Sequence, residues 1–60
     1  MSLNELLTTM QNEMYGATEE IEKFINGNKS AGTRVRKNMQ NIKTVAQNVR
    51  QKVQEMKNNS

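Results

Sequence analysis

Two seven-residue repeats of apolar residues constrain the fold of this chain more than any other feature. Within residues 3–24, and again within residues 35–56, apolar positions are separated alternately by four and by three residues. The first stripe consists of Leu3, Leu7, Met10, Met14, Ala17, Ile21 and Phe24, and the second consists of Val35, Met39, Ile42, Ala46, Val49, Val53 and Met56. This spacing is typical of amphipathic helices that pack along a narrow apolar stripe, so it predicts two such helices.

The residues that flank and separate the repeats predict where the helices begin and end. Ser2 is a candidate N-cap for the first helix, and Glu5 three residues later completes a capping box. Gly27 can adopt the left-handed conformation that ends a helix, and either Asn28 or Ser30 can cap the second one. Because so short a connection makes neighbouring helices run antiparallel, a hairpin is expected.

The predicted fold class is all-α, an antiparallel and coiled-coil-like two-helix hairpin. Folding at the turn brings stripe against stripe, with Ile21 facing Val35, and Gly32 leaves room for the Phe24 ring. Gly16 is expected on the outer face of the first helix. The predicted single domain covers residues 1–60, with the first helix at about 2–26, the turn at about 27–29 and the second helix at about 30–57.

The chain is short for a stable domain, and the predicted hairpin leaves further apolar side chains uncovered. A domain of 60 residues buries only about 60% of its unfolded surface, so its stability is marginal without a staple or a partner. Leu6, Ile25, Ala31 and Val45 lie beside the stripes and would stay partly exposed in a lone hairpin. Because a second hairpin would cover them in a four-helix bundle, we expect a homodimer.

The composition excludes several classes of protein. The chain has no cysteine and no histidine, which removes disulfides, thiolate metal sites and the usual acid–base catalyst. We therefore expect no enzyme, no cofactor, no metal site and no small-molecule substrate. No apolar run exceeds two residues, which excludes a membrane-spanning helix and the apolar segment of a signal peptide.

Charge is distributed unequally between the two halves of the chain. The formal net charge of +3 is the sum of −4 for residues 1–26, with one lysine and five glutamates, and +7 for residues 27–60, with eight cations and one glutamate. Such an asymmetry indicates either pairing between the halves or a polyanionic partner of the basic half.

Cations recur at every seventh position of the predicted second helix. The corresponding positions of the first helix are uncharged, so the hairpin itself offers these cations no acidic counterpart, which favours a polyanion as partner. Pairing with the acidic face of a second subunit and a merely solvated face remain alternatives. The basic column consists of Lys29, Arg36, Lys43, Arg50 and Lys57, and it is widened by Arg34, Lys37 and Lys52.

Double-stranded DNA is the polyanion that this pattern fits best. A row of lysines and arginines on a rigid helix contacts phosphates without reading bases, and the column contains no aromatic side chain for stacking on single strands. Duplex RNA fits by the same logic, whereas a membrane surface fits less well because the hairpin uses the apolar stripe. The alternative function is a coiled-coil structural module that binds an acidic protein or itself. The candidate DNA-binding residues are Lys29, Arg34, Arg36, Lys37, Lys43, Arg50 and Lys52.

Residues 27–43, GNKSAGTRVRKNMQNIK, resemble the signature of the histone H1-like family of small bacterial nucleoid proteins, and residues 19–29, EEIEKFINGNK, are similar to the acidic helix that precedes it. The resemblance implies non-specific DNA binding and compaction, in the cytoplasm as part of a nucleoid or in a packaged viral genome. The motif cations would be Lys29, Arg34, Arg36 and Lys37. Many members continue into a tail rich in lysine and alanine, whereas this chain ends in EMKNNS, so we expect bridging of DNA without strong condensation.

Overall fold

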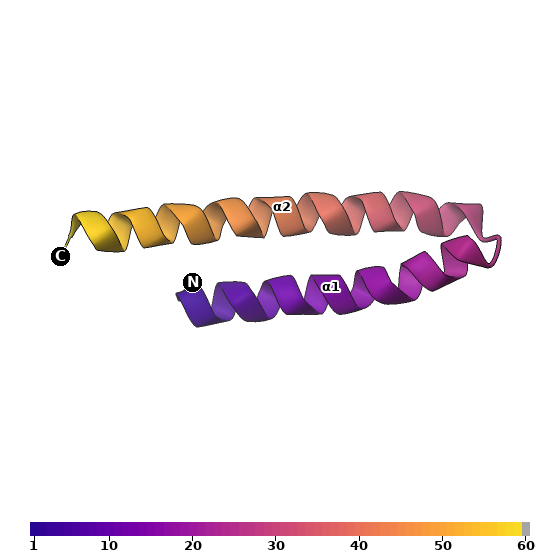
Figure 1. The fold of residues 1–60 in the computed structure, drawn as a ribbon, viewed down its shortest axis with the longest axis horizontal. Helices are drawn as coiled ribbons and strands as arrows, with labels where there is room; N and C mark the ends of the chain where they lie inside the picture. Colours follow the sequence, from indigo (N-terminus) through magenta and orange to yellow (C-terminus); the bar gives the residue numbers. More distant parts are fainter. Residues whose placement is uncertain (60) are drawn as a thin grey trace.

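The computed structural model describes residues 1–59 and shows two helices that run antiparallel. Helix α1 spans Leu3–Ile25 and helix α2 spans Lys29–Asn58, and they lie side by side along most of their length (Figure 1). The hairpin measures 51 × 15 × 13 Å, and the residues described contain no strand. The prediction of an all-α helical hairpin is confirmed.

The start of α1 is fixed by the predicted capping box. The Ser2 hydroxyl oxygen accepts a hydrogen bond from the Glu5 backbone N–H at 3.1 Å, and the Glu5 carboxylate accepts one from the Ser2 N–H at 3.2 Å. These bonds satisfy two amide groups that the helix cannot pair itself, and such caps typically stabilise a helix by about 1 kcal/mol.

The turn is closed by a Schellman motif centred on Gly27. This glycine has φ 106°, as predicted, and its N–H donates to the Phe24 carbonyl at 3.1 Å. The Asn28 N–H donates to the Lys23 carbonyl at 3.0 Å, which completes the motif. Of the two candidate N-caps for α2, Asn28 is the one used, because its side-chain oxygen accepts from the Ala31 N–H at 3.3 Å.

The face through which the helices touch is rotated from the predicted one. Leu6 and Ala31 are buried together with Ala17, so the expectation that Leu6 and Ala31 would stay partly exposed is wrong. Conversely, Leu7 and Met39, which were expected to face the partner helix, are exposed. In each helix, alternate residues of the predicted stripe are replaced in the contact by the residue one position earlier in the sequence. The contact therefore still repeats every seven residues.

Polar side chains occupy part of this rotated contact. Asn38 donates to one Glu13 carboxylate oxygen at 2.8 Å, and Asn41 donates to the other at 3.2 Å. Two turns farther along α1, the Arg34 Nε donates to Glu20 at 2.6 Å. A carboxylate is tolerated between the helices because these donors satisfy it, and apolar spacing alone does not reveal such pairs.

The two helical glycines have different surroundings. A Cβ atom on Gly32 would lie 2.9 Å from Phe24 Cε1, so the predicted room for this ring is confirmed. Gly16 was expected on the outer face, but a Cβ there would lie 3.6 Å from the Asn38 amide nitrogen on α2. The half-buried Gly16 thus lies beside the contact, which is a further consequence of the rotation.

Candidate nucleic-acid interface

The basic column lies along α2, which is one unbroken helix from Lys29 to Asn58. A seven-residue step closes nearly two full turns, so consecutive members point to the same side at about 10.5 Å intervals. Lys29, Arg36, Lys43 and Arg50 are all exposed, and they span about 32 Å of the helix axis. The column is therefore a straight, rigidly spaced row of cations.

These four cations have no acidic partner within the hairpin. Among residues 1–59, Glu20 forms ion pairs with Lys23 at 3.4 Å and with Arg34 at 2.6 Å. Neither of these pairs involves Lys29, Arg36, Lys43 or Arg50. The positive charge of Lys29, Arg36, Lys43 and Arg50 is thus not compensated by neighbouring acids.

Arg34 occupies a different side of α2 and is engaged by α1. It lies about 160° around the helix from Arg36, and its guanidinium binds the largely covered Glu20 carboxylate, whose side chain is 17% exposed. The hydrogen bond from Arg34, followed by the charges of Arg34 and Lys23, lowers the pKa of Glu20, and partial burial opposes this shift. Arg34 serves as a link between the helices in this arrangement.

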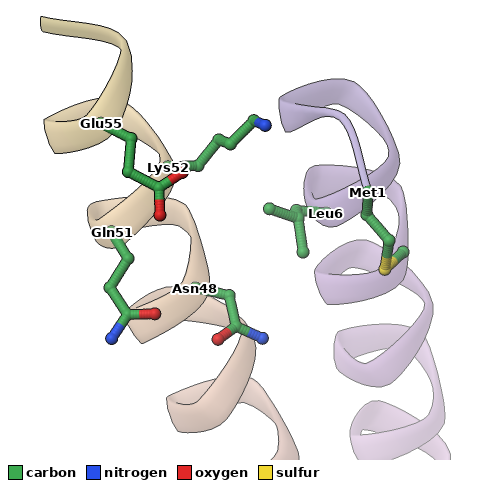
Figure 2. Close-up of a pocket in the computed structure, with 6 residues that line it drawn as sticks. All are labelled: Met1, Leu6, Asn48, Gln51, Lys52 and Glu55. Carbon is green, nitrogen blue, oxygen red and sulfur yellow. The ribbon is translucent and has the colours of Figure 1, made fainter. Parts of the chain in front are cut away.

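Lys37 and Lys52 also lie away from the column. Lys37 is exposed about 100° around α2 from Arg36, beside the groove that contains Glu20 and Arg34. Lys52 is half-buried at the open end of the hairpin, where its side chain and that of Leu6 extend into the space between the helices (Figure 2). The seven candidate residues therefore divide into four that share one side of α2 and three that do not.

A groove of about 430 Å³ adjoins the column near the turn. Lys29 and Arg36 border it, and Ile21, Phe24 and Val35 contribute apolar surface from both helices. Sequence reasoning missed this groove because it placed Ile21 and Val35 inside the hairpin. One signal in the sequence could have revealed it. Glu20 directly precedes Ile21, and an arginine lies at the same level of α2, so an ion pair between these two residues would turn Ile21 outward.

Neither a metal centre nor a membrane-spanning helix is found among residues 1–59. Within residues 1–59, no cluster of three or more His, Cys, Asp or Glu side chains is placed to hold a metal ion. Neither of the two helices described has the length and apolar character needed to cross a bilayer.

Comparison with known proteins identifies the family. The family model described as Histone H1-like protein Hc1 matches residues 4–59, which include nearly all of α1, all of α2 and the whole basic column. No curated protein and no solved structure matches the chain. The resemblance carried by residues 27–43 is thereby confirmed and extended to nearly the whole chain, and the family is one of DNA-binding structural proteins rather than enzymes. The chain therefore belongs to the histone H1-like protein Hc1 family.

Proposed function

We propose that this chain binds double-stranded DNA without sequence preference through the basic column of α2, as a homodimer that organises a nucleoid in the cytoplasm or a packaged genome. One observation carries the proposal: Lys29, Arg36, Lys43 and Arg50 share one side of an unbroken helix and have no acidic partner in the hairpin. Membership of a DNA-binding family supports it.

The mechanism is electrostatic. Each lysine or arginine that neutralises a phosphate releases a condensed counterion, and this release favours binding at low salt. Phosphate contacts carry no sequence information, and both aromatic residues, Tyr15 and Phe24, belong to α1. The column thus has no side chain that would stack on unpaired bases, which favours duplex over single-stranded DNA.

The three other candidate residues have secondary roles in this proposal. Lys37 directly follows Arg36 in the sequence, so it widens the positive surface near the turn. Arg34 mainly links α2 to Glu20, and Lys52 mainly covers the open end of the hairpin beside Leu6. Four phosphates neutralised by Lys29, Arg36, Lys43 and Arg50 imply a log–log salt slope of about −3.6.

Titration of short duplexes of unrelated sequence, followed by fluorescence anisotropy between 50 and 200 mM salt, tests the proposal. We expect equal affinities for all sequences and a slope of about −3.6, which Arg36→Gln and Lys43→Gln each reduce in magnitude by about 0.9. Lys23→Gln is the matched control, because it removes one cation from α1 and should leave the slope unchanged. If Lys23→Gln has the same effect as the column variants, binding follows net charge and the proposed surface is wrong.

A second candidate function, an assembly module, is favoured by the apolar side chains that the hairpin leaves uncovered. Leu7, Met14 and Met39 are among the exposed large hydrophobic residues. Self-association with no DNA binding at low salt would select the assembly module over the DNA-binding protein.

A further inference from the structure

The rotation of the helices leaves an extended apolar surface on the outside of the hairpin. Every second residue of each predicted stripe is turned away from the partner helix; Leu7 is 48% exposed, Met14 55% and Met39 44%. We call this surface the apolar face, and it consists of Leu7, Met14 and Ile21 of α1 with Met39, Ala46 and Val53 of α2. Large exposed apolar patches are rare on monomeric proteins and mark interaction sites.

Both helices contribute to the same side of the hairpin. In each helix the apolar-face residue follows the residue in contact by one position, which turns it by about 100°. Because the helices run antiparallel, this turn has the opposite sense in space for the two helices and brings both sets to one side. The groove near the turn shows this directly, since Ile21 of α1 and Val35 of α2 line it together.

The hairpin has too small a core to be stable alone. Among the residues described, only Leu6, Ala17 and Ala31 are buried hydrophobic residues, and two of these are alanines. Fully burying a leucine-sized side chain stabilises a protein by roughly 1.5–3 kcal/mol, whereas ordering each residue costs about 1–2 kcal/mol of conformational entropy. Further burial is therefore required, and the apolar face is where it can occur.

We propose that the apolar face binds the same face of a second copy of this chain, with α2 of one copy over α1 of the other and both turns at the same end. The part of the hairpin in which α1 and α2 lie side by side is about 35 Å long, because α1 has 23 residues, and it is 15 Å wide, so its projected area is about 520 Å². Two such faces together reach about 1,000 Å², which is the lower bound for a specific protein interface. The resulting dimer is a four-helix bundle in which all neighbouring helices are antiparallel.

The same two faces could also pack with α2 of one copy over α2 of the other. Electrostatic repulsion disfavours that alternative. The basic column adjoins the apolar face, because Lys29 and Arg36 border the groove that Ile21 lines. If α2 packed over α2, two rows of like charge would meet along one edge of the bundle, which is unfavourable. With α2 over α1, the column lies instead beside uncharged residues such as Gln11 and Thr18 and near the exposed Glu22.

The arrangement places the two basic columns on opposite edges of the dimer. This consequence rests on the proposed DNA-binding function, whereas the dimer itself does not. Long lysine and arginine side chains reach water from such rim positions. One dimer can then hold two duplexes, one on each edge, and bridge them.

Sedimentation equilibrium of the full chain tests the interface. Met14→Gln combined with Met39→Gln keeps side-chain length and net charge but makes the centre of the apolar face polar, so we expect the dimer to weaken on the order of 100-fold. Tyr15→Gln is the matched control, because Tyr15 is 73% exposed on the outer side of α1 and should not change association. A wild-type chain that remains monomeric, or a control that weakens the dimer equally, overturns the proposal.

Spin labels on an Asn26→Cys variant test the orientation, since the chain has no other cysteine. Turns at the same end place the labels within about 25 Å, whereas the opposite orientation separates them by the length of α1, about 35 Å or more. A distance in the longer range overturns the arrangement of α2 over α1.

A pull-down of one labelled duplex by a second, immobilised duplex separates the dimer from DNA binding. We expect the Met14→Gln/Met39→Gln variant to keep its salt slope for one duplex and to lose the bridging. A wild-type dimer that binds no DNA would refute the proposed function and leave the interface intact. Binding of a monomeric chain to phosphatidylglycerol vesicles through the apolar face would overturn the interface in favour of a membrane surface.

Discussion

Replacing Gly16 by alanine is expected to stabilise the hairpin, although the same replacement at Gly32 is not. Both glycines lie inside helices, where alanine is favoured over glycine by about 1 kcal/mol. At Gly16 the new Cβ would lie 3.6 Å from Asn38, which is an ordinary van der Waals contact. At Gly32 it would lie 2.9 and 3.0 Å from two atoms of the Phe24 ring, so the ring would have to move.

The magnitudes follow from these surroundings. Gly16→Ala should raise the free energy of unfolding by about 1 kcal/mol. At Gly32 the same gain is offset by overpacking, which costs typically about 1–3 kcal/mol, so the net change is a loss of about 0–2 kcal/mol. We therefore expect the Gly16→Ala variant to be more stable than the Gly32→Ala variant by about 1–3 kcal/mol.

Urea unfolding followed by far-ultraviolet circular dichroism measures this difference. All variants must be compared at one protein concentration, because the stability of an associating protein depends on concentration. Gly27→Ala provides a negative reference, since φ 106° strains any residue with a side chain. The reasoning is refuted if Gly16→Ala destabilises the protein, or if Gly32→Ala stabilises it as much as Gly16→Ala does.

Three further predictions concern the polar contacts. Glu13→Ala should lower the free energy of unfolding by about 1–2 kcal/mol, because Asn38 and Asn41 lose their charged acceptor; urea unfolding unchanged from the wild type would contradict this. Arg34 holds the pKa of Glu20 below its ordinary value of 4.5, so the ionised form stabilises the fold above that pH and the stability is lost as the pH falls through the lowered pKa. Thermal unfolding across acidic pH should show this loss, and a Glu20→Gln profile of the same steepness would contradict it. Arg34→Gln should leave the salt slope of DNA binding unchanged, and a decrease of about 0.9 in a salt titration would place Arg34 in the interface.

The hairpin, its caps and its turn could be predicted from sequence because short segments determine them. Ser2 and Glu5 are three residues apart, and Gly27 and Asn28 act on the adjacent backbone, so their roles need no knowledge of tertiary contacts. The position of the turn also predicted which residues near it lie opposite each other on the two helices. The Phe24 ring, for example, lies against Gly32 as expected. The family resemblance depended on a short string within this same region.

The rotation of the helices could not be predicted, because a seven-residue period fixes spacing and not the partner of each apolar position. Met14 and Glu13 are neighbours, and apolarity favoured Met14 as the residue in contact. Glu13 takes that place because Asn38 and Asn41 satisfy its carboxylate. The same rotation determines the candidate site, since it brings Glu20 to Arg34 and separates this arginine from the basic column.

The unequal length of the helices has a consequence for how tightly each end of the molecule is held. Helix α2 has 30 residues and α1 has 23, so the end of α2 projects beyond the start of α1 (Figure 1). A few turns of isolated helix are marginal in water, and local opening is easiest where tertiary contacts are fewest. Amide hydrogens near the end of α2 should therefore exchange with solvent much faster than those in the part of α2 that packs against α1. Arg36 lies in that packed part, so it loses less backbone entropy than a cation near the end of α2 when it binds a phosphate.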